Sequence, residues 1–309
     1  MIDQPDLVVI GGANTDFCAK GNGLPEKGKS APGEQFQSQP GGKGINQAIG
    51  AARLGAKVAL VAMLGSDIRA EEILARLEAE GVDARCVSRT DSALTGATLI
   101  MIGEEGKTTR MWVAGANRFL LPSVVEGVST LLHSARLVLA QLEVPSASLM
   151  RAFEFVHERR IPTMLDVDPP APMSDAMMAL IDVIRMDLDA ARVISGVPVT
   201  DRDSATSVAR NLINRGARIV AMQSPDDGNI VVAHDVAYSF PPVPVVPIDR
   251  TGAGDAFSAA FAVALVEGKP LDEAGFLANA AAAWCTTRMG ALAGLPTRNE
   301  LDAFVASHL

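Results

Sequence analysis

Short apolar runs alternate with amphipathic stretches along most of the chain. The runs are rich in Val, Ile, Leu and Met, as is typical of strands buried on both faces. The intervening stretches repeat apolar residues three and four positions apart, as on one face of a helix. Strands are expected at 7–10, 58–63, 137–140, 163–165, 183–184 and 219–222, and helices at 45–54, 69–80, 123–133, 146–159, 173–181 and 203–215. This alternation predicts an α/β fold with a mostly parallel sheet covered by helices on both faces.

One segment departs from the alternation. Residues 95–103 and 107–113 are both rich in strand-forming residues, and Glu104-Glu105-Gly106 joins them, which predicts a hairpin. We expect a single domain over 1–309 with a small β lid inserted from about 15–40 and 94–115. The alternative is that the hairpin merely extends the edge of the main sheet. Apolar residues on a lid edge, such as Met111 and Trp112, favour a homodimer through the lid.

The stretch Asp249-Arg250-Thr251-Gly252-Ala253-Gly254-Asp255 precedes a run, 256–266, that has almost no polar side chain. Such a run predicts a fully buried helix. Gly252, Ala253 and Gly254 would leave the backbone N–H groups at its start uncovered, where the helix dipole favours an anion. The alternative is that Asp255 only caps the helix and the glycines only form a turn.

Nine polar residues and one glycine follow the carboxyl ends of the expected strands. In open α/β sheets, ligands bind at this edge. Any one of these residues could cap a helix, but together they indicate a site for a polyhydroxylated or metal-bound ligand. They are Gly65, Asp67, Gln141, Glu143, Asp166, Asp168, Asp187, Asp189, Gln223 and Ser224.

Composition narrows the class of protein. The chain has 309 residues, 48% of them hydrophobic, and a formal net charge of −9 without a basic patch, which argues against nucleic acid or an anionic membrane as the main partner. Cys18, Cys86 and Cys285 have neither zinc nor disulfide-framework spacing. The start of the chain lacks a leader pattern, and no apolar run is long enough to span a membrane. We therefore expect a cytoplasmic protein.

Several motifs occur in a defined order along the chain. They are an Asn-x-Asp loop at 14–16, GGKGINQAIGAARLGA at 41–56, GAN at 115–117, QLE at 141–143, DRTGAGDAF at 249–257, NAAAAWCTTRMGA at 279–291 and LPTRNEL at 295–301. With these motifs the chain resembles, nearly end to end, the ribokinase-like (PfkB) carbohydrate kinases. The resemblance implies a three-layer α/β/α fold with a small β lid.

The resemblance also implies a reaction, the transfer of the γ-phosphoryl group of ATP to the primary hydroxyl of a sugar, first of all ribose. Asp255 would be the general base, and the N–H groups of Gly252, Ala253 and Gly254 would stabilise the transferred phosphoryl group. Mg²⁺ and K⁺ would be the ions involved. The letters GLPEKGKS at 23–30 match GxxxxGK[ST], but they lie in a stretch rich in Gly, Pro and Lys that no expected helix follows directly, so we do not expect a P-loop.

The family pattern assigns further roles by position. The sugar would contact Asn14, Asp16, Gly42, Lys43, Asn46, Glu143 and Asp255. Asp16 would accept hydrogen bonds from two sugar hydroxyls, while a solvated side chain is the alternative for Lys43. The nucleotide would contact Asp187, Gln223, Gly228, Gly254 and Asn279. Asn279 would lie near the adenine, or simply bind water on a helix face. A monovalent cation would lie near Asp249, Thr251, Cys285, Arg288, Gly290 and Gly294.

The chain departs from the family pattern on the nucleotide side. In the run RMDLDA at 185–190, Asp187 replaces an asparagine, Ala190 replaces a glutamate that organises Mg²⁺, and Asp189 is one residue early. Pro225 stands at a glycine position and removes a backbone donor, while Asp226-Asp227 adds negative charge.

Arg250 is a third departure, since it replaces a threonine beside the anion site. Two hypotheses follow from the departures. The first is a working kinase for ribose, or for another sugar or a nucleoside, with a modified nucleotide site. The second is a sugar-binding protein of kinase fold that acts as a sensor.

Overall fold

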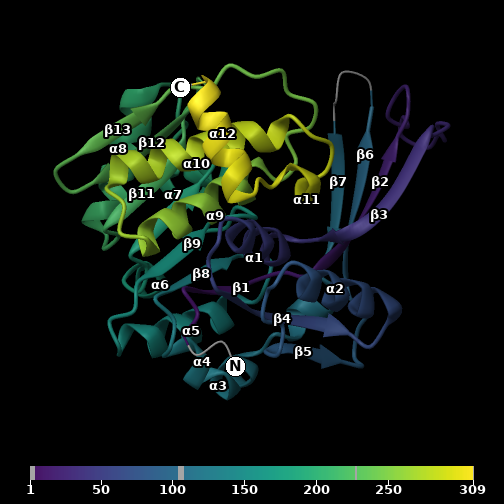
Figure 1. Cartoon of the computed structure of the whole chain (residues 1–309), viewed down its shortest axis with the longest axis horizontal. Helices are drawn as coiled ribbons and strands as arrows, with labels where there is room; N and C mark the ends of the chain where they lie inside the picture. The colour runs from purple at the N-terminus through teal and green to yellow at the C-terminus, as the bar shows by residue number, and fades with distance from the viewer. Residues whose placement is uncertain (1–3, 104–107, 227, 309) are drawn as a thin grey trace.

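The computed structural model describes residues 4–103, 108–226 and 228–308, and a nine-stranded sheet forms its centre (Figure 1). The strand order is β13-β12-β11-β10-β9-β8-β1-β4-β5. All neighbouring pairs from β11 to β5 are parallel, and β12 runs antiparallel to both of its neighbours. The bounds are β1 Leu7–Ile10, β4 Val58–Gly65, β5 Val87–Thr90, β8 Leu137–Gln141, β9 Thr163–Asp166, β10 Val183–Met186, β11 Ile219–Gln223, β12 Asn229–Ala233 and β13 Ala237–Phe240. The predicted mostly parallel sheet is confirmed.

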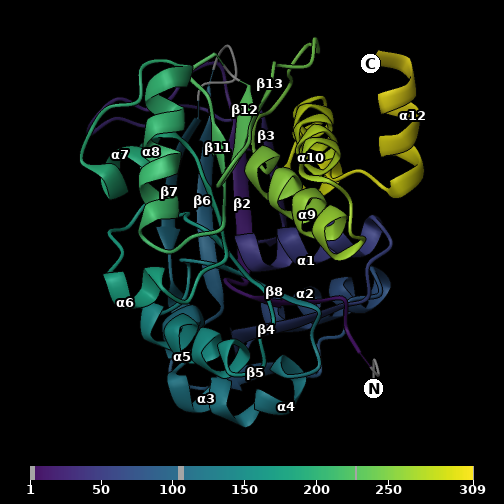
Figure 2. The same cartoon turned by 90° about the vertical axis from the view of Figure 1, so that its left-hand side faces the viewer.

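Two apolar cores lie on opposite faces of this sheet. Successive strand side chains point to opposite faces, so Leu7 and Val9 of β1 join one core and Val8 and Ile10 join the other. The first core is covered by α1 (Lys43–Arg53), α2 (Ile68–Ala79), α9 (Ala253–Val266), α10 (Leu271–Thr286), α11 (Ala291–Gly294) and α12 (Arg298–His308). The second is covered by α3 (Pro122–Gly127), α4 (Ser129–Leu132), α5 (Ser146–His157), α6 (Asp175–Met178), α7 (Leu188–Ser195) and α8 (Arg202–Asn214). Figure 2 shows the three layers, as predicted.

The helix predictions differ from the structure in a few places. The helix expected at 123–133 is divided into α3 and α4, with Gly127 at the end of the first; glycine is a poor helix former. The helix expected at 173–181 is only the single turn of α6. The apolar, alanine-rich α10 was not predicted, because a helix without a polar face has no clear period of 3.6 residues.

A second, four-stranded sheet stands beside the first (Figure 1). Its order is β3 (Gln35–Gly41), β2 (Asn14–Lys20), β6 (Gly96–Ile102) and β7 (Thr108–Val113), with β2 and β6 parallel and the other pairs antiparallel. The predicted hairpin is β6 and β7, and its turn at 104–106 lies outside the described residues. No pairing between described residues joins the two sheets, so the hairpin does not extend the edge of the main sheet.

Candidate active site

The loop before α9 leaves the start of this helix without a side-chain cap. Gly252 has φ 85°, and a Cβ there would come 2.7 Å from the Cβ of Ala291, so only glycine fits. Asp255 accepts hydrogen bonds from Asn46 Nδ2 (2.8 Å) and Gln47 Nε2 (3.0 Å), both on α1. The interpretation of Asp255 as a helix cap is therefore wrong. The N–H of Ala253 donates to the carbonyl of Arg250 at a long 3.3 Å, while the N–H groups of Gly252 and Gly254 stay available for an anion among the described residues.

Asp255 lies where two pockets meet. The smaller has a volume of about 220 Å³ and the larger about 740 Å³. Five residues line both pockets: Lys43, Arg110, Asp168, Gly252 and Asp255. Ligands in the two pockets would therefore meet at the Asp255 carboxylate, an arrangement suited to moving a group from one ligand to the other.

The smaller pocket contains most of the residues expected to bind the sugar. Asp16, Gly42, Lys43, Asn46 and Glu143 line it together with Asp255, although they come from β2, α1 and the segment after β8. Two buried polar atoms nearby, Asn14 Nδ2 and Asn46 Oδ1, have no hydrogen-bond partner among the described residues. Buried polar groups are normally satisfied, so these atoms fit a polyhydroxylated ligand.

Asn14 lies behind this pocket and is held by the GAN segment. Its Oδ1 accepts a hydrogen bond from Asn117 Nδ2 at 2.7 Å, and Asn117 Oδ1 accepts one from the N–H of Ala13 at 2.9 Å. Asn117 was part of a recognised motif, but the sequence did not indicate that its amide orients Asn14.

Glycines make room for the carboxylates of the smaller pocket. A Cβ on Gly41 would lie 2.1 Å from Asp16 Oδ2, and one on Gly12 would lie 2.2 Å from Glu143 Oε2. Gly42 has φ 90°, and its Cβ would lie 2.9 Å from the backbone N of Asn14. The glycine pairs of the sequence therefore allow the acids to approach the backbone closely.

Burial changes the ionisation of the acids in this pocket. It raises the pKa of Asp16 to about 6 and that of Glu143 to about 7. Burial also disfavours the Lys43 ammonium, but Asp255, Asp168 and Glu143 outweigh it, so the pKa of Lys43 is raised. The Lys43 ammonium pairs with Asp168 and its side chain is only 22% exposed. The interpretation of Lys43 as a solvated lysine is therefore wrong.

A buried hydrogen-bond network lies beneath Asp255, and the sequence did not predict it. Gln47 Nε2 donates to Asp255 Oδ1 and to Asp166 Oδ2 (2.8 Å), while Gln47 Oε1 accepts from Gln141 Nε2 at 2.6 Å. Asp166 also accepts from Ser258 Oγ at 2.8 Å and from Arg185 Nη1 at 3.0 Å. The network fixes the orientation of the Asp255 carboxylate.

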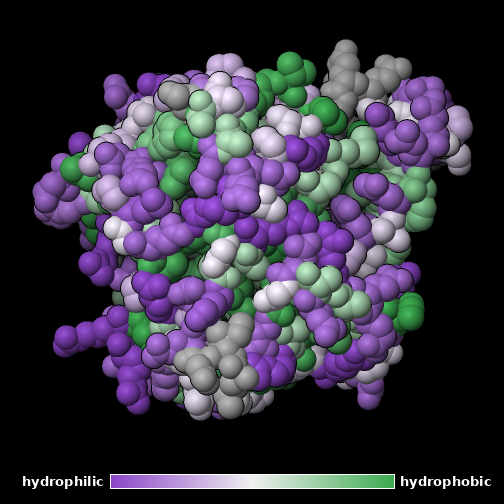
Figure 3. Space-filling view, in the orientation of Figure 1, coloured by the Kyte–Doolittle hydropathy of each residue, from purple (hydrophilic) through white to green (hydrophobic). Residues whose placement is uncertain are grey.

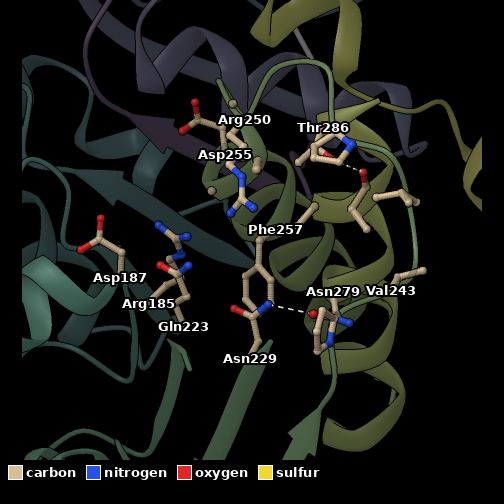
Figure 4. Close-up of a pocket in the computed structure, with 18 of the residues that line it drawn as sticks. Arg185, Asp187, Gln223, Asn229, Val243, Arg250, Asp255, Phe257, Asn279 and Thr286 are labelled. Atoms are coloured by element: carbon tan, nitrogen blue, oxygen red, sulfur yellow. Dashed lines mark hydrogen bonds between the residues drawn. The ribbon is translucent and has the colours of Figure 1, made fainter. Parts of the chain in front are cut away.

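The larger pocket lies between the ends of β10 and β11 on one side and α9 and α10 on the other (Figure 4). Asp187, Gln223, Gly254 and Asn279 line it, as expected, but Gly228 does not. The carbonyl of Gly228 accepts a hydrogen bond from Ser224 N at 2.8 Å and so closes the turn after β11. The apolar part of the wall includes the segment 242–247 and Phe257.

Asn279 is held by the protein itself. Its Nδ2 donates to the carbonyl of Pro241 at 2.9 Å, and its Oδ1 accepts from Asn229 Nδ2 at 2.8 Å. Both bonds hold the segment after β13 and the start of β12 against α10. The alternative of a water-bound Asn279 is therefore wrong, and Asn229 is a pocket residue that the sequence did not single out.

Some polar residues at the strand ends have structural roles. Asp67 caps α2 through Ala70 N, and Asp187 caps α7 through Ala190 N. Asp189 is 76% exposed and pairs with Arg192, so it points away from the pocket as expected. Two other departures from the family pattern, Asp226 and Ala190, change the charge of the nucleotide pocket less than the sequence indicated.

Asp226 forms an ion pair with Arg202 of α8, which offsets its charge, while Asp227 lies outside the described residues. Ala190 is fully buried and contributes no ligand. The nucleotide pocket therefore has a changed set of ligands, but no uncompensated charge from Asp226.

The residues expected around a monovalent cation lie close together behind the start of α9. Asp249 accepts from Thr251 N through Oδ1 and from Gly290 N through Oδ2, both at 2.9 Å. Cys285 Sγ lies 3.6 Å from the carbonyl of Thr251, and a Cβ on Gly294 would lie 2.6 Å from the carbonyl of Cys285. The Arg288 guanidinium instead stacks on Trp284.

Within the described ranges no group of three or more His, Cys, Asp or Glu is arranged to hold a metal ion. Among the helices of the described residues, none is both long and apolar enough to cross a membrane. The three cysteines are unpaired.

Comparisons with known proteins agree with this geometry. Residues 4–298 match the model of the pfkB family of carbohydrate kinases. The chain is 31% identical over 299 residues to a ribokinase of Haemophilus influenzae, covering 97% of this chain and 98% of that protein, and 27% identical to a deoxyribokinase of Salmonella typhi, covering 97% and 99%. The structure of Arabidopsis thaliana ribokinase complexed with ribose and ATP superposes with a TM-score of 0.90 at 28% identity, covering 98% and 99%. The chain therefore belongs to the pfkB family of carbohydrate kinases, enzymes that transfer a phosphoryl group to a hydroxyl group.

Proposed function

We propose that this protein transfers the γ-phosphoryl group of ATP to the primary hydroxyl of ribose. The observation that carries the proposal is the position of Asp255 between a small polar pocket and a larger pocket that ends on an uncapped helix start. Relatives that are named ribokinase, and a solved ribokinase with ribose and ATP, support it. The deoxyribokinase relative makes a related sugar the second candidate.

In the proposed reaction, the Asp255 carboxylate takes the proton of the sugar hydroxyl. The hydroxyl oxygen forms a bond to the γ-phosphorus, and the bond from that phosphorus to the β–γ bridging oxygen breaks, which releases ADP. The N–H groups of Gly252, Ala253 and Gly254 stabilise the charge on the transferred group. Asn46 and Gln47 keep the carboxylate aimed at the hydroxyl, because both donate to it.

The residues present also fit the expected ions. Asp168 and Asp187 line the larger pocket, and carboxylates together with nucleotide phosphates are the usual ligands of Mg²⁺. Mg²⁺ would offset negative charge on the phosphates. K⁺ would be held near Asp249 and the carbonyl of Thr251, where its charge would support the anion site.

A coupled assay with ribose, ATP, Mg²⁺ and K⁺ tests the proposal. We expect turnover that is lost in Asp255→Asn, lower turnover when Li⁺ replaces K⁺, and ribose 5-phosphate as the product by NMR. A panel with 2-deoxyribose, other pentoses and nucleosides identifies the preferred acceptor. Ribose binding without turnover above that variant would reject the kinase and support the sugar sensor, which Ala190 and Pro225 favour.

The pH dependence of sugar use should follow the carboxylates of the smaller pocket. Asp16 binds hydroxyls as the ionised acceptor, and burial raises its pKa to about 6. Below that pH it becomes protonated, so we expect kcat/KM for the sugar to fall about tenfold per pH unit. Glu143 has a pKa of about 7, so its protonation should start the fall of kcat/KM at a higher pH than the protonation of Asp16. Steady-state rates from pH 5 to 9 measure this profile. In Asp16→Asn the part of the decline due to Asp16 should disappear, and an unchanged profile would contradict the assignment.

We also propose that the four-stranded sheet is the lid of the smaller pocket and the dimer interface. Thr98 and Trp112 line the pocket, while Leu99, Met111 and Val113 of the same strands are exposed on the other face. Figure 3 shows apolar and polar residues mixed on the side of this sheet.

Met111 is 64% exposed, and Met111→Glu would place charge in the proposed interface. We expect the wild type to sediment as a dimer at micromolar concentration and Met111→Glu as a monomer. Val197→Glu, which changes an exposed apolar residue just after α7, is the matched control. A wild type that is monomeric at that concentration would rule out the interface.

A further inference from the structure

Arg185 is a buried cation in the larger pocket, at the end of β10. It is 8% exposed, and its Nη1 donates to Asp166 Oδ1 at 3.0 Å. Burial disfavours its charged form, but Asp166, Asp168 and Asp187 outweigh this, so the pKa of Arg185 is raised. A buried arginine is costly unless it is paired, and Asp166 meets that need.

The guanidinium of Arg185 lies directly against the first turn of α9. A Cβ on Gly254 would come 2.8 Å from Nη2 and 2.9 Å from Nη1. This is the positive end of the helix dipole, where an added cation is unfavourable in the absence of an anion. The cation and the uncovered N–H groups of the loop therefore converge on one place, which suits a multiply charged anion.

Asp166 holds Arg185 in this position. Its Oδ2 accepts from Gln47 Nε2 and Ser258 Oγ, both at 2.8 Å, so the carboxylate itself is fixed. The bond from Arg185 to Asp166 uses Nη1. Figure 4 shows Arg185 on the side of the pocket formed by β10 and β11, across from Asp255 and Phe257 of α9. The second terminal nitrogen, Nη2, is thus not engaged in that hydrogen bond and lies against Gly254, and Arg185 is one of the residues that line the pocket.

We propose that Arg185 binds the phosphoryl group that is transferred, and that Asp166 positions it for that contact. The inference rests on the proposed function, because it takes the γ-phosphoryl group of a nucleotide as the anion. Guanidinium binds phosphate oxygens through parallel N–H bonds, so Arg185 and the N–H groups of Gly252, Ala253 and Gly254 surround the group as its bond to the bridging oxygen breaks and its bond to the sugar oxygen forms. Arg185 stays protonated throughout, and the hydroxyl proton goes to Asp255.

This contact also explains how the nucleotide site can work without two groups of the family pattern. The glutamate position is occupied by the buried Ala190, and Pro225 offers no N–H. Arg185 supplies a fixed positive charge on the same side of the pocket. A fixed, buried donor needs little rearrangement during the reaction, which is the condition for strong stabilisation of developing charge.

Binding measurements test the contact directly. In isothermal titration calorimetry with Mg²⁺, we expect Arg185→Met to weaken binding of the non-hydrolysable triphosphate AMP-PCP by more than about tenfold, since a hydrogen bond to a charged group is worth about 1.5–3 kcal/mol. Binding of AMP, which lacks the γ-phosphate, should change less than threefold. Arg185→Lys should lie in between, and Arg192→Met, which alters an exposed arginine of α7, is the matched control.

A second variant separates phosphate binding from the ion pair. Arg185→Met leaves Asp166 buried without its cation, whereas Arg185→Met with Asp166→Asn removes both charges. If Arg185 only neutralises Asp166, the double variant should bind AMP-PCP as the wild type does, and this result would overturn the proposal. If Arg185 contacts the phosphate, the double variant should regain thermal stability but not AMP-PCP affinity.

The titrations need no turnover, so they separate the two proposals. A wild type without turnover on the whole sugar panel would reject the proposed function, and the binding comparison would still decide about Arg185. A wild type that binds AMP-PCP no more tightly than AMP would reject the role of Arg185, whatever the kinase assay shows. When turnover is present, kcat of Arg185→Met should fall by about 10²–10³-fold, as for loss of a donor to a developing charge.

Discussion

Replacing Asp255 by asparagine is expected to lower kcat for sugar phosphorylation by about 10²–10⁴-fold, the range for loss of a general base. An amide has nearly the same shape but takes up no proton at neutral pH. Its NH₂ group would also face a donor, since Asn46 and Gln47 each donate to one oxygen of the present carboxylate. The sugar should still bind, because its other contacts in the smaller pocket are unchanged.

Three measurements on Asp255→Asn make this prediction specific. They are steady-state kcat and KM, the dissociation constant of the sugar by calorimetry, and the melting temperature. Asp189→Asn, at an exposed acid outside the pocket, is the matched control and should keep wild-type rates. A kcat within tenfold of the wild type would show that Asp255 is not the base.

Replacing Asp16 by alanine is expected to weaken sugar binding by at least about 10²-fold, since two hydrogen bonds to a charged acceptor are worth about 1.5–3 kcal/mol each. Asp16 lines the smaller pocket and not the larger one. The dissociation constant of AMP-PCP measured without sugar should therefore stay within about threefold of the wild type. Equal losses for both ligands would instead mean that Asp16 supports the fold.

The stability of the Asp16 variant has a predictable sign. Its folded-state pKa is about 6, above the ordinary value of 3.8, so the folded state resists ionising this carboxylate. Above pH 6 the ionised form therefore reduces stability, and the cost disappears as the pH falls through 6 toward 3.8. Asp16→Asn, measured beside Asp16→Ala, should accordingly melt no lower than the wild type at pH 8, so that a loss of sugar binding in Asp16→Asn cannot be ascribed to unfolding.

The order of the elements follows from the sequence, because its signals are local. Short apolar runs and period-3.6 patterns depend on neighbours a few positions apart, and these placed most helices and the strands of the parallel sheet within a few residues, except β5, which was not predicted. The uncovered start of α9 was equally visible, since Gly252, Ala253 and Gly254 are adjacent in the chain. Where local signals were weak, as in the uniformly apolar α10, the element was missed.

The tertiary structure decided what those elements do together. Asn46 and Asp255 are 209 positions apart, and Lys43 and Asp168 are 125 apart, so no local pattern reveals that they touch. The structure removed two alternatives that the sequence had left open: Asp255 is not a helix cap but an acceptor held by two amides, and Asn279 is not a water-bound residue but a link to Asn229.

Arg185 shows most clearly the difference between what the sequence determines and what tertiary packing determines. In the sequence it is one cation in an altered motif, and its charge alone assigns no partner. Asp166 and Gly254 come beside it only because β9, β10 and α9 meet at the carboxyl edge of the sheet. Local residue patterns determine the elements, whereas packing over long sequence separations determines which side chains share a buried space and therefore which charges interact.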